Sequence, residues 1–341
     1  MKTHEQVRKG DPGKQERNEN GMRAVWLHEF GGPGVLVVAD TPDPVAEAGQ
    51  ALIEVAFANI TFVDTQFRAS GFGPFKAELP MIPGNGIGGV VIAVGSQADS
   101  GLVGKQVVSS TGGSGGYAER VVVDVGSLFE VPDGLALDHA VALLADGRTA
   151  SALIRAAELH RGERVLVEAA AGGVGTLLVQ LAKSAGTSVV AVVGGARKVE
   201  MIRDLGADVV VDYSEPDWVE QVRAAVGSVD VVFDGVGGSI GRSAFEVLDR
   251  GGRMLSFGMA SGQWTDISEE AAAGRGVTLV NLPRPTPEEM RTLTEGVLTL
   301  AATSRLQPVI GQRFPLDQAA EAHRAIESRA TVGKTLLEVR K

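Results

Sequence analysis

Residues 164–175, which read RVLVEAAAGGVG, constrain the fold of this chain more than any other segment. An apolar strand pattern runs directly into a glycine turn, and the turn opens a helical pattern over residues 173–185. The spacing Ala170-x-Gly172-x-x-Gly175 is that of a dinucleotide-binding turn in which alanine replaces the first glycine. The missing Cβ of Gly172 lets a diphosphate approach the backbone, and Gly175 lets the helix pack closely on the strand. Free N–H groups at the start of the helix then face the phosphates.

Strand and helix patterns alternate after this turn. Amphipathic segments around 197–205 and 218–226 separate runs rich in valine, and the expected strands are 188–193, 209–213, 229–234, 253–257 and 277–280. Near-continuous valine runs are typical of strands buried on both faces of a parallel sheet. We therefore predict an α/β fold with a doubly wound parallel sheet, a Rossmann domain whose glycine turn binds a dinucleotide. A glycine turn without a ligand is the alternative.

The segment after the second expected strand indicates which dinucleotide is bound. NAD-binding sites place an acidic residue about 20 residues past the glycines, where it accepts a hydrogen bond from the ribose 2′-hydroxyl. Here residues 193–198 read VGGARK, and the first carboxylate is Glu200. Gly194 leaves room for a 2′-phosphate, and Arg197 and Lys198 supply positive charge. We therefore predict NADPH as the cofactor. The alternative is that the two cations begin a solvated helix face.

Composition excludes several classes of protein. The 341 residues allow about two domains, and no apolar run is long enough to span a membrane. A net charge of −10 disfavours a general nucleic-acid surface. The chain has no cysteine, which excludes disulfides, thiolate catalysis and cysteine-ligated zinc. Residues 1–21 are polar and carry no signal-peptide core, so we expect a disordered N-terminal extension and a cytoplasmic location.

The residues on either side of the Rossmann pattern have a different character. Residues 22–145 contain short strands between Gly- and Pro-rich turns, typical of a β-barrel-like domain; the expected strands are 34–38, 51–57, 88–94, 106–109 and 120–125. Residues 285–341 carry two helical segments, 287–303 and 316–326, and strands near Val309 and at 335–339, too little for a core of their own. We therefore expect a catalytic domain (22–145), an inserted Rossmann domain (146–284) and a C-terminal segment (285–341) that completes the catalytic domain.

Several short motifs occur in an order that resembles one superfamily. They are residues 60–65 (ITFVDT), 82–90 (IPGNGIGGV), 115–119 (GGYAE), 146–150 (DGRTA), 205–208 (LGAD) and 330–334 (ATVGK), together with the glycine turn. Over residues 22–341 the chain resembles the medium-chain dehydrogenase/reductase superfamily, specifically its zinc-free quinone oxidoreductase branch. This resemblance implies a GroES-like, β-rich catalytic domain beside the Rossmann domain, with the active site in the cleft between them.

A comparison with the zinc-dependent alcohol dehydrogenases of the same superfamily argues against a metal. The places of their zinc-binding Cys and of the Asp three residues later are similar to Thr61 and Asp64, and their Gly-His-Glu motif corresponds to Gly84-Asn85-Gly86. Neither place supplies a good zinc ligand. The five histidines of the chain are scattered without metal-like spacing, so no metal site is expected.

Without a metal to stabilise an alkoxide, reduction of a quinone or a conjugated enone is the expected activity. Hydride would pass from NADPH to an acceptor whose negative charge spreads over a conjugated oxygen. Thr61 is the first candidate for a hydroxyl that lines the substrate site, and Tyr117 is the second. The alternatives are that Tyr117 packs in a strand and that Asp64 caps a helix starting near Thr65.

The resemblance also implies a set of cofactor contacts, grouped by the part of NADPH that they would touch. They are Gly172, Gly173 and Val174 at the diphosphate; Gly194, Arg197, Lys198 and Tyr213 at the 2′-phosphate; Thr149, Phe257, Gly258 and Leu282 on the nicotinamide side; and Lys334, for which a surface position is the alternative.

Relatives pair the edge strand of the Rossmann sheet across a two-fold axis, so the resemblance also implies a homodimer. Two other kinds of function remain open. One is a different enzyme of the same fold, such as an enoyl-thioester reductase or a zinc-free alcohol dehydrogenase. The other is a non-enzymatic protein that binds NADPH or RNA, although the acidity of the chain disfavours RNA.

Overall fold

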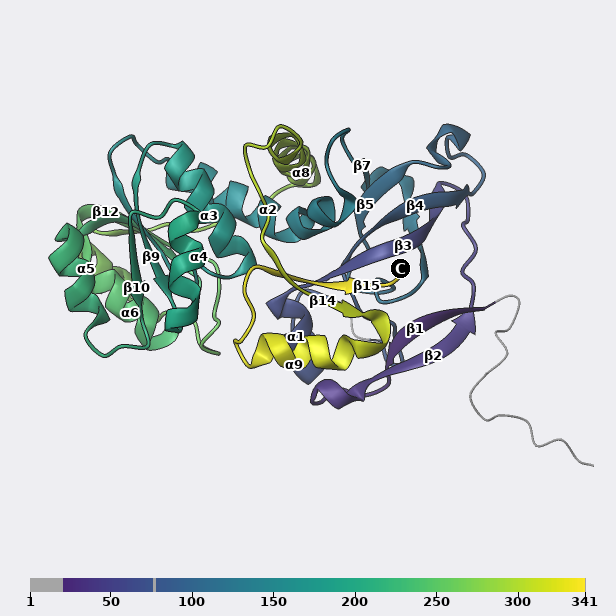
Figure 1. Ribbon diagram of the computed structural model, residues 1–341, viewed down its shortest axis with the longest axis horizontal. Coiled ribbons are helices and arrows are strands. Elements are labelled where there is room, and N and C mark those ends of the chain that lie inside the picture. The colour runs from purple at the N-terminus through teal and green to yellow at the C-terminus, as the bar shows by residue number, and fades with distance from the viewer. Residues whose placement is uncertain (1–20, 76–77, 341) are drawn as a thin grey trace, which may run out of the picture.

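The computed structural model describes residues 21–75 and 78–340 and shows two lobes side by side (Figure 1). The long helix α2 (Leu137–Ala157) runs between them. Most of the predicted disordered extension, residues 1–21, lies outside the described residues. Its last residue, Gly21, is not disordered but begins strand β1 (Gly21–Leu27), because it pairs with Pro42 of the neighbouring strand. Within the described ranges, no helix is both long and apolar enough to cross a membrane.

One lobe contains a six-stranded sheet in the order β10-β9-β8-β11-β12-β13, in which every neighbouring pair is parallel. Its strands are β8 (Arg164–Val167), β9 (Ser188–Val193), β10 (Val209–Asp212), β11 (Val229–Asp234), β12 (Leu248–Ser256) and β13 (Thr278–Leu279). Its helices are α3 (Gly173–Ser184), α4 (Val199–Asp204), α5 (Trp218–Val226), α6 (Gly238–Glu246) and α7 (Glu269–Arg275). The chain moves outward from β8 to β10 and returns to the other side of β8 at β11, which confirms the doubly wound Rossmann fold.

Alternating burial explains the valine runs of this sheet. Val165 and Val167 of β8 belong to one hydrophobic cluster, together with Leu177 of α3. Leu166, between them, belongs to a second cluster with Trp218 of α5. Successive side chains of a strand point to opposite faces, so a sheet covered by helices on both sides needs apolar residues at every position.

Two predicted elements of this lobe have different bounds in the structure. The helix expected around 197–205 begins with a 3-10 turn, Ala196–Lys198, and continues as α4. The turn forms because Gly195 has a φ of 101° and its carbonyl accepts from the N–H of Lys198. The sixth strand, expected at 277–280, is reduced to the two residues of β13, because Val277 N–H still bonds to Ala272 in α7.

The other lobe is rich in strands. A seven-stranded sheet runs in the order β14-β15-β3-β4-β5-β7, with β6 paired to β3, and β1 and β2 form a separate antiparallel ribbon. The strands are β2 (Leu36–Pro42), β3 (Gln50–Ile60), β4 (Gly86–Val94), β5 (Gln106–Ser110), β6 (Arg120–Asp124), β7 (Leu128–Glu130), β14 (Ile310–Pro315) and β15 (Lys334–Glu338). Ile53, Val55 and Ile87 lie in the core of this lobe, which has the expected β-rich character.

The C-terminal segment returns to the β-rich lobe. Helix α8 (Pro287–Ala302) begins at a capping box in which Thr286 and Glu289 bond to each other's backbone N–H groups. Strand β15 then lies between β14 and β3, as the yellow ribbon in Figure 1 shows, and helix α9 (Ala319–Glu327) packs against α1 (Phe62–Ser70). The predicted domain boundary at 145/146 falls inside α2, which packs against α3 of one lobe and against β4 and β5 of the other. We therefore propose that both domains share α2.

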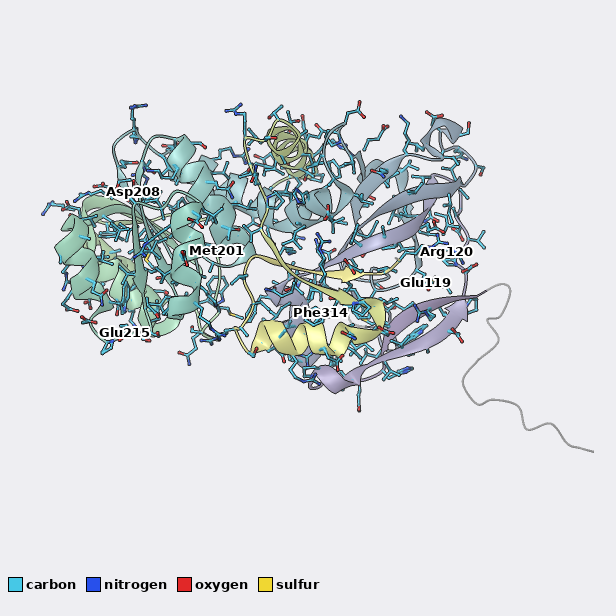
Figure 2. The ribbon with its side chains drawn as sticks, viewed as in Figure 1. Glu119, Arg120, Met201, Asp208, Glu215 and Phe314 are labelled. Carbon is cyan, nitrogen blue, oxygen red and sulfur yellow. The ribbon has the colours of Figure 1, made fainter. Side chains whose placement is uncertain are left out.

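Charged side chains cover the outside of both lobes (Figure 2). Asp208, in the Rossmann lobe, accepts two hydrogen bonds of 2.8 Å from Lys183, and Glu119, in the β-rich lobe, pairs with Arg23 at 3.2 Å. Pairs as exposed as these contribute little to stability. They do not mark a functional site.

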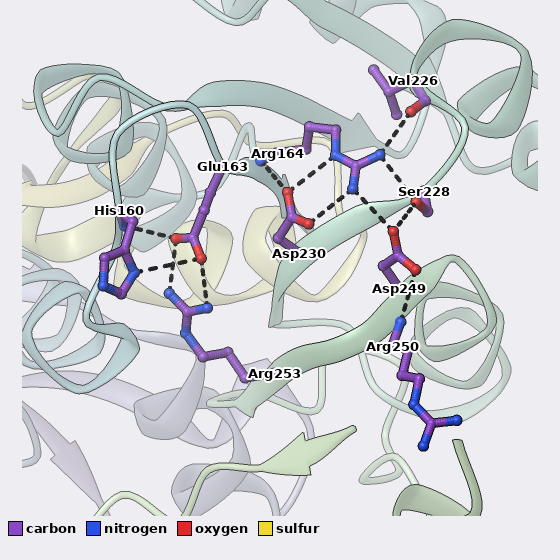
Figure 3. Close-up of polar contacts among 9 residues, drawn as sticks. All are labelled: His160, Glu163, Arg164, Val226, Ser228, Asp230, Asp249, Arg250 and Arg253. Atoms are coloured by element: carbon purple, nitrogen blue, oxygen red, sulfur yellow. Dashed lines mark hydrogen bonds and ion pairs between the residues drawn. The ribbon is translucent and has the colours of Figure 1, made fainter. Parts of the chain in front are cut away.

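A larger network of ion pairs lies at the amino ends of β8, β11 and β12 (Figure 3). Arg164 donates to both oxygens of Asp230, at 3.0 and 2.8 Å. Arg253 pairs with Glu163 at 2.8 Å. Ligands of doubly wound folds bind at the opposite, carboxyl edge of the sheet. The network in Figure 3 therefore stabilises the sheet and leaves the ligand edge free.

Candidate functional site

The glycine turn after β8 has the geometry that a dinucleotide requires. Helix α3 begins at Gly173. Its N-cap residue is Gly172, which has no side chain to bond the N–H groups of the first turn. A Cβ on Gly175 would lie 2.3 Å from the carbonyl oxygen of Ala169 and 2.7 Å from the Cα of Ala170. Only glycine allows this approach, so the helix packs on the strand as the sequence requires. The N–H groups of its first turn are left to bind a diphosphate.

The end of the chain lies against this turn. The N–H of Gly333 donates to the carbonyl of Ala171 at 2.7 Å, and Gly333 forms a parallel bridge with Gly172. These contacts bring the start of β15, in the β-rich lobe, to the carboxyl edge of the Rossmann sheet. The two lobes thus meet at the place where a doubly wound fold binds its ligand.

A group of cations lies beyond the end of β9. Lys198 is half-buried, and its Nζ donates to the carbonyl of Arg329 at 2.9 Å. Burial lowers the pKa of Lys198, and the nearby positive charges of Arg197 and Arg329 lower it further. Arg329 also donates to the carbonyl of Ala260 at 2.8 Å. The sequence analysis missed Arg329, because it joins Arg197 and Lys198 only through contacts between residues 131 positions apart.

Tyr213 packs against the turn that carries these cations. A Cβ on Gly194 would lie 2.7 Å from the hydroxyl of Tyr213, so the absence of a side chain lets this ring lie against the backbone of the turn. The nearest acid, Asp212, is the last residue of β10, and its Oδ1 accepts hydrogen bonds from Gly195 N and Ser214 N, both at 2.9 Å. This oxygen therefore holds the turn in place.

The remaining predicted contacts lie at three places. Phe257 and Gly258 directly follow β12, and their N–H groups donate to the carbonyl of Asp234 at 2.9 and 3.3 Å. Leu282 is partly exposed after β13. Thr149 lies on α2, and its hydroxyl donates within the helix to Ala145 at 2.9 Å. The segment after β12 and Leu282 after β13 lie at the same carboxyl edge of the Rossmann sheet as the glycine turn.

Thr61 is the N-cap of α1 and is bonded to Asp64. The hydroxyl of Thr61 donates to Oδ2 of Asp64 at 2.6 Å and accepts from the N–H of Asp64 at 3.3 Å. The alternative of a helix starting near Thr65 with Asp64 as its cap is therefore wrong: the helix starts at Phe62, because Thr61 caps it. Burial raises the pKa of Asp64, and the hydrogen bonds from Thr61 oppose this rise.

The structure does not support Tyr117 as a catalytic hydroxyl. Its side chain is fully buried, and its hydroxyl lies 3.0 Å from Nε2 of His323. The ring also covers Gly84, where a Cβ would come within 2.4 Å of it. Tyr117 lies at a bend before β6 rather than in a strand. Burial raises the pKa of Tyr117 well above its ordinary value, and its hydroxyl is a structural hydrogen-bonding group in the core of the β-rich lobe.

Lys334 is not a surface lysine. It is 3% exposed, and its Nζ pairs with Oδ1 of Asp146, which is 8% exposed, at 2.9 Å. Asp146 comes from α2 and approaches the glycine turn so closely that a Cβ on Gly173 would lie 1.9 Å from its Oδ2. The pair therefore lies directly behind the predicted diphosphate site.

Two buried acids that the sequence analysis did not single out lie at the carboxyl ends of β8 and β11. Glu168 and Asp234 are both fully buried. Glu168 Oε2 accepts from Val236 N at 3.0 Å, while its Oε1 has no partner among the described residues. Burial raises the pKa of Glu168 well above its usual value, and the charge of Asp234 adds to the rise. Each residue ends a valine run, but only the parallel pairing of β8 with β11 shows that they are neighbours.

The structure also tests the places where zinc enzymes of this superfamily bind their metal. Among the described residues, no group of three or more His, Asp or Glu side chains is arranged to hold a metal ion. Asp64 is engaged by Thr61, and Gly86 has no side chain. The donors at these positions do not fit a zinc ion.

Comparisons with known proteins give a consistent result. A model of the alcohol dehydrogenase GroES-like domain matches residues 47–133, and a model named zinc-binding dehydrogenase matches residues 205–337. A quinone oxidoreductase of Pseudomonas aeruginosa is 32% identical over 323 residues, which are 92% of this chain and 99% of the relative. Escherichia coli quinone oxidoreductase in complex with NADPH superposes with a TM-score of 0.84 at 30% identity, over 93% of this chain and 99% of that one. A mycobacterial structure complexed with NADPH gives 0.83 at 34% identity, over 93% and 99% of the two chains.

The sheet order and the glycine turn, together with the NADPH-bound relatives, define an oxidoreductase that uses a nicotinamide cofactor. The chain belongs to the medium-chain dehydrogenase/reductase superfamily, in its quinone oxidoreductase branch, as its motifs predict.

Proposed function

We propose that this protein is an NADPH-dependent, zinc-independent oxidoreductase that transfers hydride to a quinone or a conjugated enone. The observation that carries the cofactor preference is the convergence of Arg197, Lys198 and Arg329 beside Gly194 and Tyr213. Strand β9 ends at Val193 and two glycines follow it, so this strand carries no carboxylate at the place where an NAD-binding site needs one. A 2′-phosphate is therefore favoured over a 2′-hydroxyl.

The cofactor supplies a hydride when it is bound. The N–H groups of Gly173 and Val174 bind and orient the diphosphate at the start of α3, while the N–H of Gly172 bonds to Ala169 and its missing side chain lets the diphosphate approach the backbone. The segment after β12 and the face of α2 that carries Thr149 form the nicotinamide side, with contacts from Phe257, Gly258 and Leu282. Lobe contacts such as Gly333 with Ala171 close the site behind the cofactor and exclude water from it.

The Thr61–Asp64 pair supplies the proton in this proposal. Quinone or enone reduction places negative charge on the oxygen of the substrate, which then needs a proton. Because burial raises the pKa of Asp64, this carboxyl can hold a proton and pass it through the hydroxyl of Thr61. The 2.6 Å hydrogen bond between them provides the path.

The cofactor preference is tested by titration of NADPH and NADH against the double variant Arg197→Ala/Lys198→Ala. We expect NADPH to bind about 10- to 100-fold more weakly, equivalent to about 1.4–2.7 kcal/mol, while NADH changes little. Arg203→Ala, a cation on the exposed side of α4, is the matched control and should leave both affinities unchanged. Equal weakening of NADPH and NADH by the double variant contradicts the assignment.

The activity is tested by following NADPH oxidation with quinones, short enones, enoyl thioesters and simple aldehydes. Turnover confined to quinones or enones supports the proposal. Turnover only with enoyl thioesters or only with aldehydes favours the two alternative enzymes. Tight NADPH binding without turnover favours a non-enzymatic protein. A stoichiometric content of zinc in the purified active protein contradicts the zinc-free mechanism.

We also propose a homodimer joined through β13, the edge strand of the Rossmann sheet. An unpaired edge is a ready template for a second strand, and two-fold pairing removes it. Leu279→Pro, which removes a backbone donor from this edge, should halve the mass measured by light scattering. A monomeric wild-type protein would refute the dimer. A cytoplasmic location stays a prediction.

A further inference from the structure

The ion pair between Lys334 and Asp146 is unusual in its burial and its position. Both side chains are almost fully shielded from water, and they are 188 residues apart in the chain. A buried pair loses the hydration of both charges, and an apolar pair of similar size often stabilises a fold as well. Fold stability alone therefore gives a weak reason for charges at this place.

The position of the pair suggests a reason connected with the ligand. Asp146 Oδ2 fills the space behind Gly173 that a Cβ would otherwise occupy. Gly173 is the first residue of α3 and belongs to the turn that binds the diphosphate in the proposed function. The residue before Lys334 is bridged to Gly172. Both partners are therefore fixed against the same turn.

The charges around this turn are out of balance without Lys334. Asp146 lies against the turn, and Asp64 is also near. Burial and the hydrogen bonds from Thr61 have the larger effects on the pKa of Asp64. The charge of Lys334 then lowers this pKa, and the charge of Asp146 raises it. A bound diphosphate adds two negative charges in front of the turn. In a site of low polarity, a carboxylate this near repels the diphosphate strongly. The ammonium group of Lys334 cancels that repulsion.

We propose that Lys334 and Asp146 act as one neutral unit of the diphosphate site: Asp146 supports Gly173 from behind, and Lys334 cancels the charge of Asp146 so that a dinucleotide diphosphate can bind. This inference rests on the proposed function, because it needs a dinucleotide at the glycine turn. It differs from a direct salt bridge between Lys334 and the cofactor. Removal of the lysine is harmful only while the carboxylate remains.

The test compares three ligands by calorimetry on the full-length chain. NADPH and NADH both contain the diphosphate, whereas adenosine 2′-monophosphate carries the 2′-phosphate without it. Lys334→Gln should weaken NADPH and NADH by about tenfold or more and adenosine 2′-monophosphate by less than about twofold. Asp146→Asn alone should tighten both dinucleotides, and Asp146→Asn/Lys334→Gln should return them to within about threefold of wild type.

A second lysine–aspartate pair provides the control. Lys183 and Asp208 bond at 2.8 Å on the surface of the same lobe, away from the turn. Lys183→Gln should leave all three affinities unchanged.

Several results would overturn the inference. They are an unchanged dinucleotide affinity in Lys334→Gln, an equal loss for adenosine 2′-monophosphate, or no recovery in the double variant. If Lys334→Gln does not fold, the single Asp146→Asn variant decides: no tightening of NADPH refutes the inference. A wild-type chain that binds neither dinucleotide refutes the proposed function and this inference together. Normal wild-type binding with no effect of the substitutions refutes this inference alone.

Discussion

The hydroxyl of Tyr117 lies 3.0 Å from Nε2 of His323, although the two residues are 206 positions apart. Both side chains have no exposed surface. The contact joins the bend before β6 to helix α9, and Arg68 of α1 lies close enough to affect the His323 ring. A hydrogen bond between two buried polar side chains replaces water at both and fixes how α9 sits on the β-rich lobe.

This contact predicts a loss of stability in mild acid. Burial, with a contribution from Arg68, lowers the pKa of His323 from 6.5 to about 3. Below pH 6.5 the His323 side chain is protonated in the unfolded chain but not in the folded protein. The free energy of unfolding therefore falls by about 1.4 kcal/mol for each pH unit until the folded pKa is reached. Denaturant unfolding between pH 7 and pH 4 measures this slope. His323→Gln should reduce it, whereas His28→Gln, at an exposed histidine, should not. Equal slopes in wild type and His323→Gln would contradict the prediction.

Glu168 predicts a dependence of the opposite sign. Because its pKa is raised in the folded protein, its contribution to stability is present below its unfolded pKa and is lost as the pH rises toward the folded pKa. Glu168→Gln keeps an oxygen for the N–H of Val236 and removes the charge. We expect a gain on the order of 1–3 kcal/mol near neutral pH, because no charge is buried and the new amide NH2 can donate to Asp234. Thermal unfolding measures it. Glu215→Gln, an exposed control, should change nothing, and a less stable Glu168→Gln protein would refute the argument.

The network in Figure 3 predicts acid sensitivity without any effect on turnover. Hydrogen bonds from Arg164 lower the pKa of Asp230, so their contribution is complete above pH 3.8 and is lost as the pH falls through the lower folded pKa. Asp230→Asn should cost about 1–3 kcal/mol at neutral pH. The exposed pair Arg291–Glu295 supplies the control: Glu295→Gln should cost less than about 0.5 kcal/mol. Denaturant unfolding and steady-state kinetics measure both, and a changed kcat in Asp230→Asn would show that this edge is not purely structural.

The close approach at Gly175 predicts a severe effect of one methyl group. Gly175→Ala places a Cβ 2.3 Å from a backbone oxygen, so helix α3 must move away from β8. We expect at least about 1–3 kcal/mol of destabilisation and loss of NADPH binding. Gly296→Ala is the control, because this glycine lies inside α8 with nothing within 4 Å of the new atom. It should stabilise the protein by about 0.5–1 kcal/mol. Normal NADPH binding in Gly175→Ala would contradict the account of the turn.

Thr61 predicts a separation of catalysis from helix capping. Thr61→Val removes the hydroxyl but keeps the shape, and kcat should fall about 100-fold or more if this hydroxyl carries the proton. Thr61→Ser should keep most of the activity. Loss of the cap in Thr61→Val costs about 1 kcal/mol, whereas serine keeps the cap. Thr286→Val, at the matching capping box of α8, should show that cost without the kinetic effect. A normal kcat in Thr61→Val would remove Thr61 from the mechanism.

The sequence predicted the Rossmann lobe more completely than the site. Valine runs such as 229–234 gave strand positions directly, because both faces of the sheet must be apolar. The site depends on long-range contacts that no local pattern contains. Arg329 reaches Lys198 only after the C-terminal segment has folded back. The sequence left a surface position open for Lys334. Its side chain is buried instead, because it turns inward to pair with Asp146.

Tyr117 shows the same limit from the other side. Its motif suggested a hydroxyl near the substrate, but burial is decided by what packs over a residue. The residue that bonds to the hydroxyl of Tyr117 is His323, which lies on helix α9, outside the motif that contains Tyr117.

The position of β15 between β14 and β3 has a consequence for biosynthesis. During translation the Rossmann lobe emerges whole and is free to fold early, but the end of β3 waits for a partner that leaves the ribosome about 275 residues later. Until then residues 57–60 of β3, beyond the stretch that pairs with β6, are an open strand edge. A stop codon before residue 334 should therefore yield a chain with a folded nucleotide lobe and an exposed, aggregation-prone remainder, and it is at this stage of synthesis that the nascent protein most needs a chaperone.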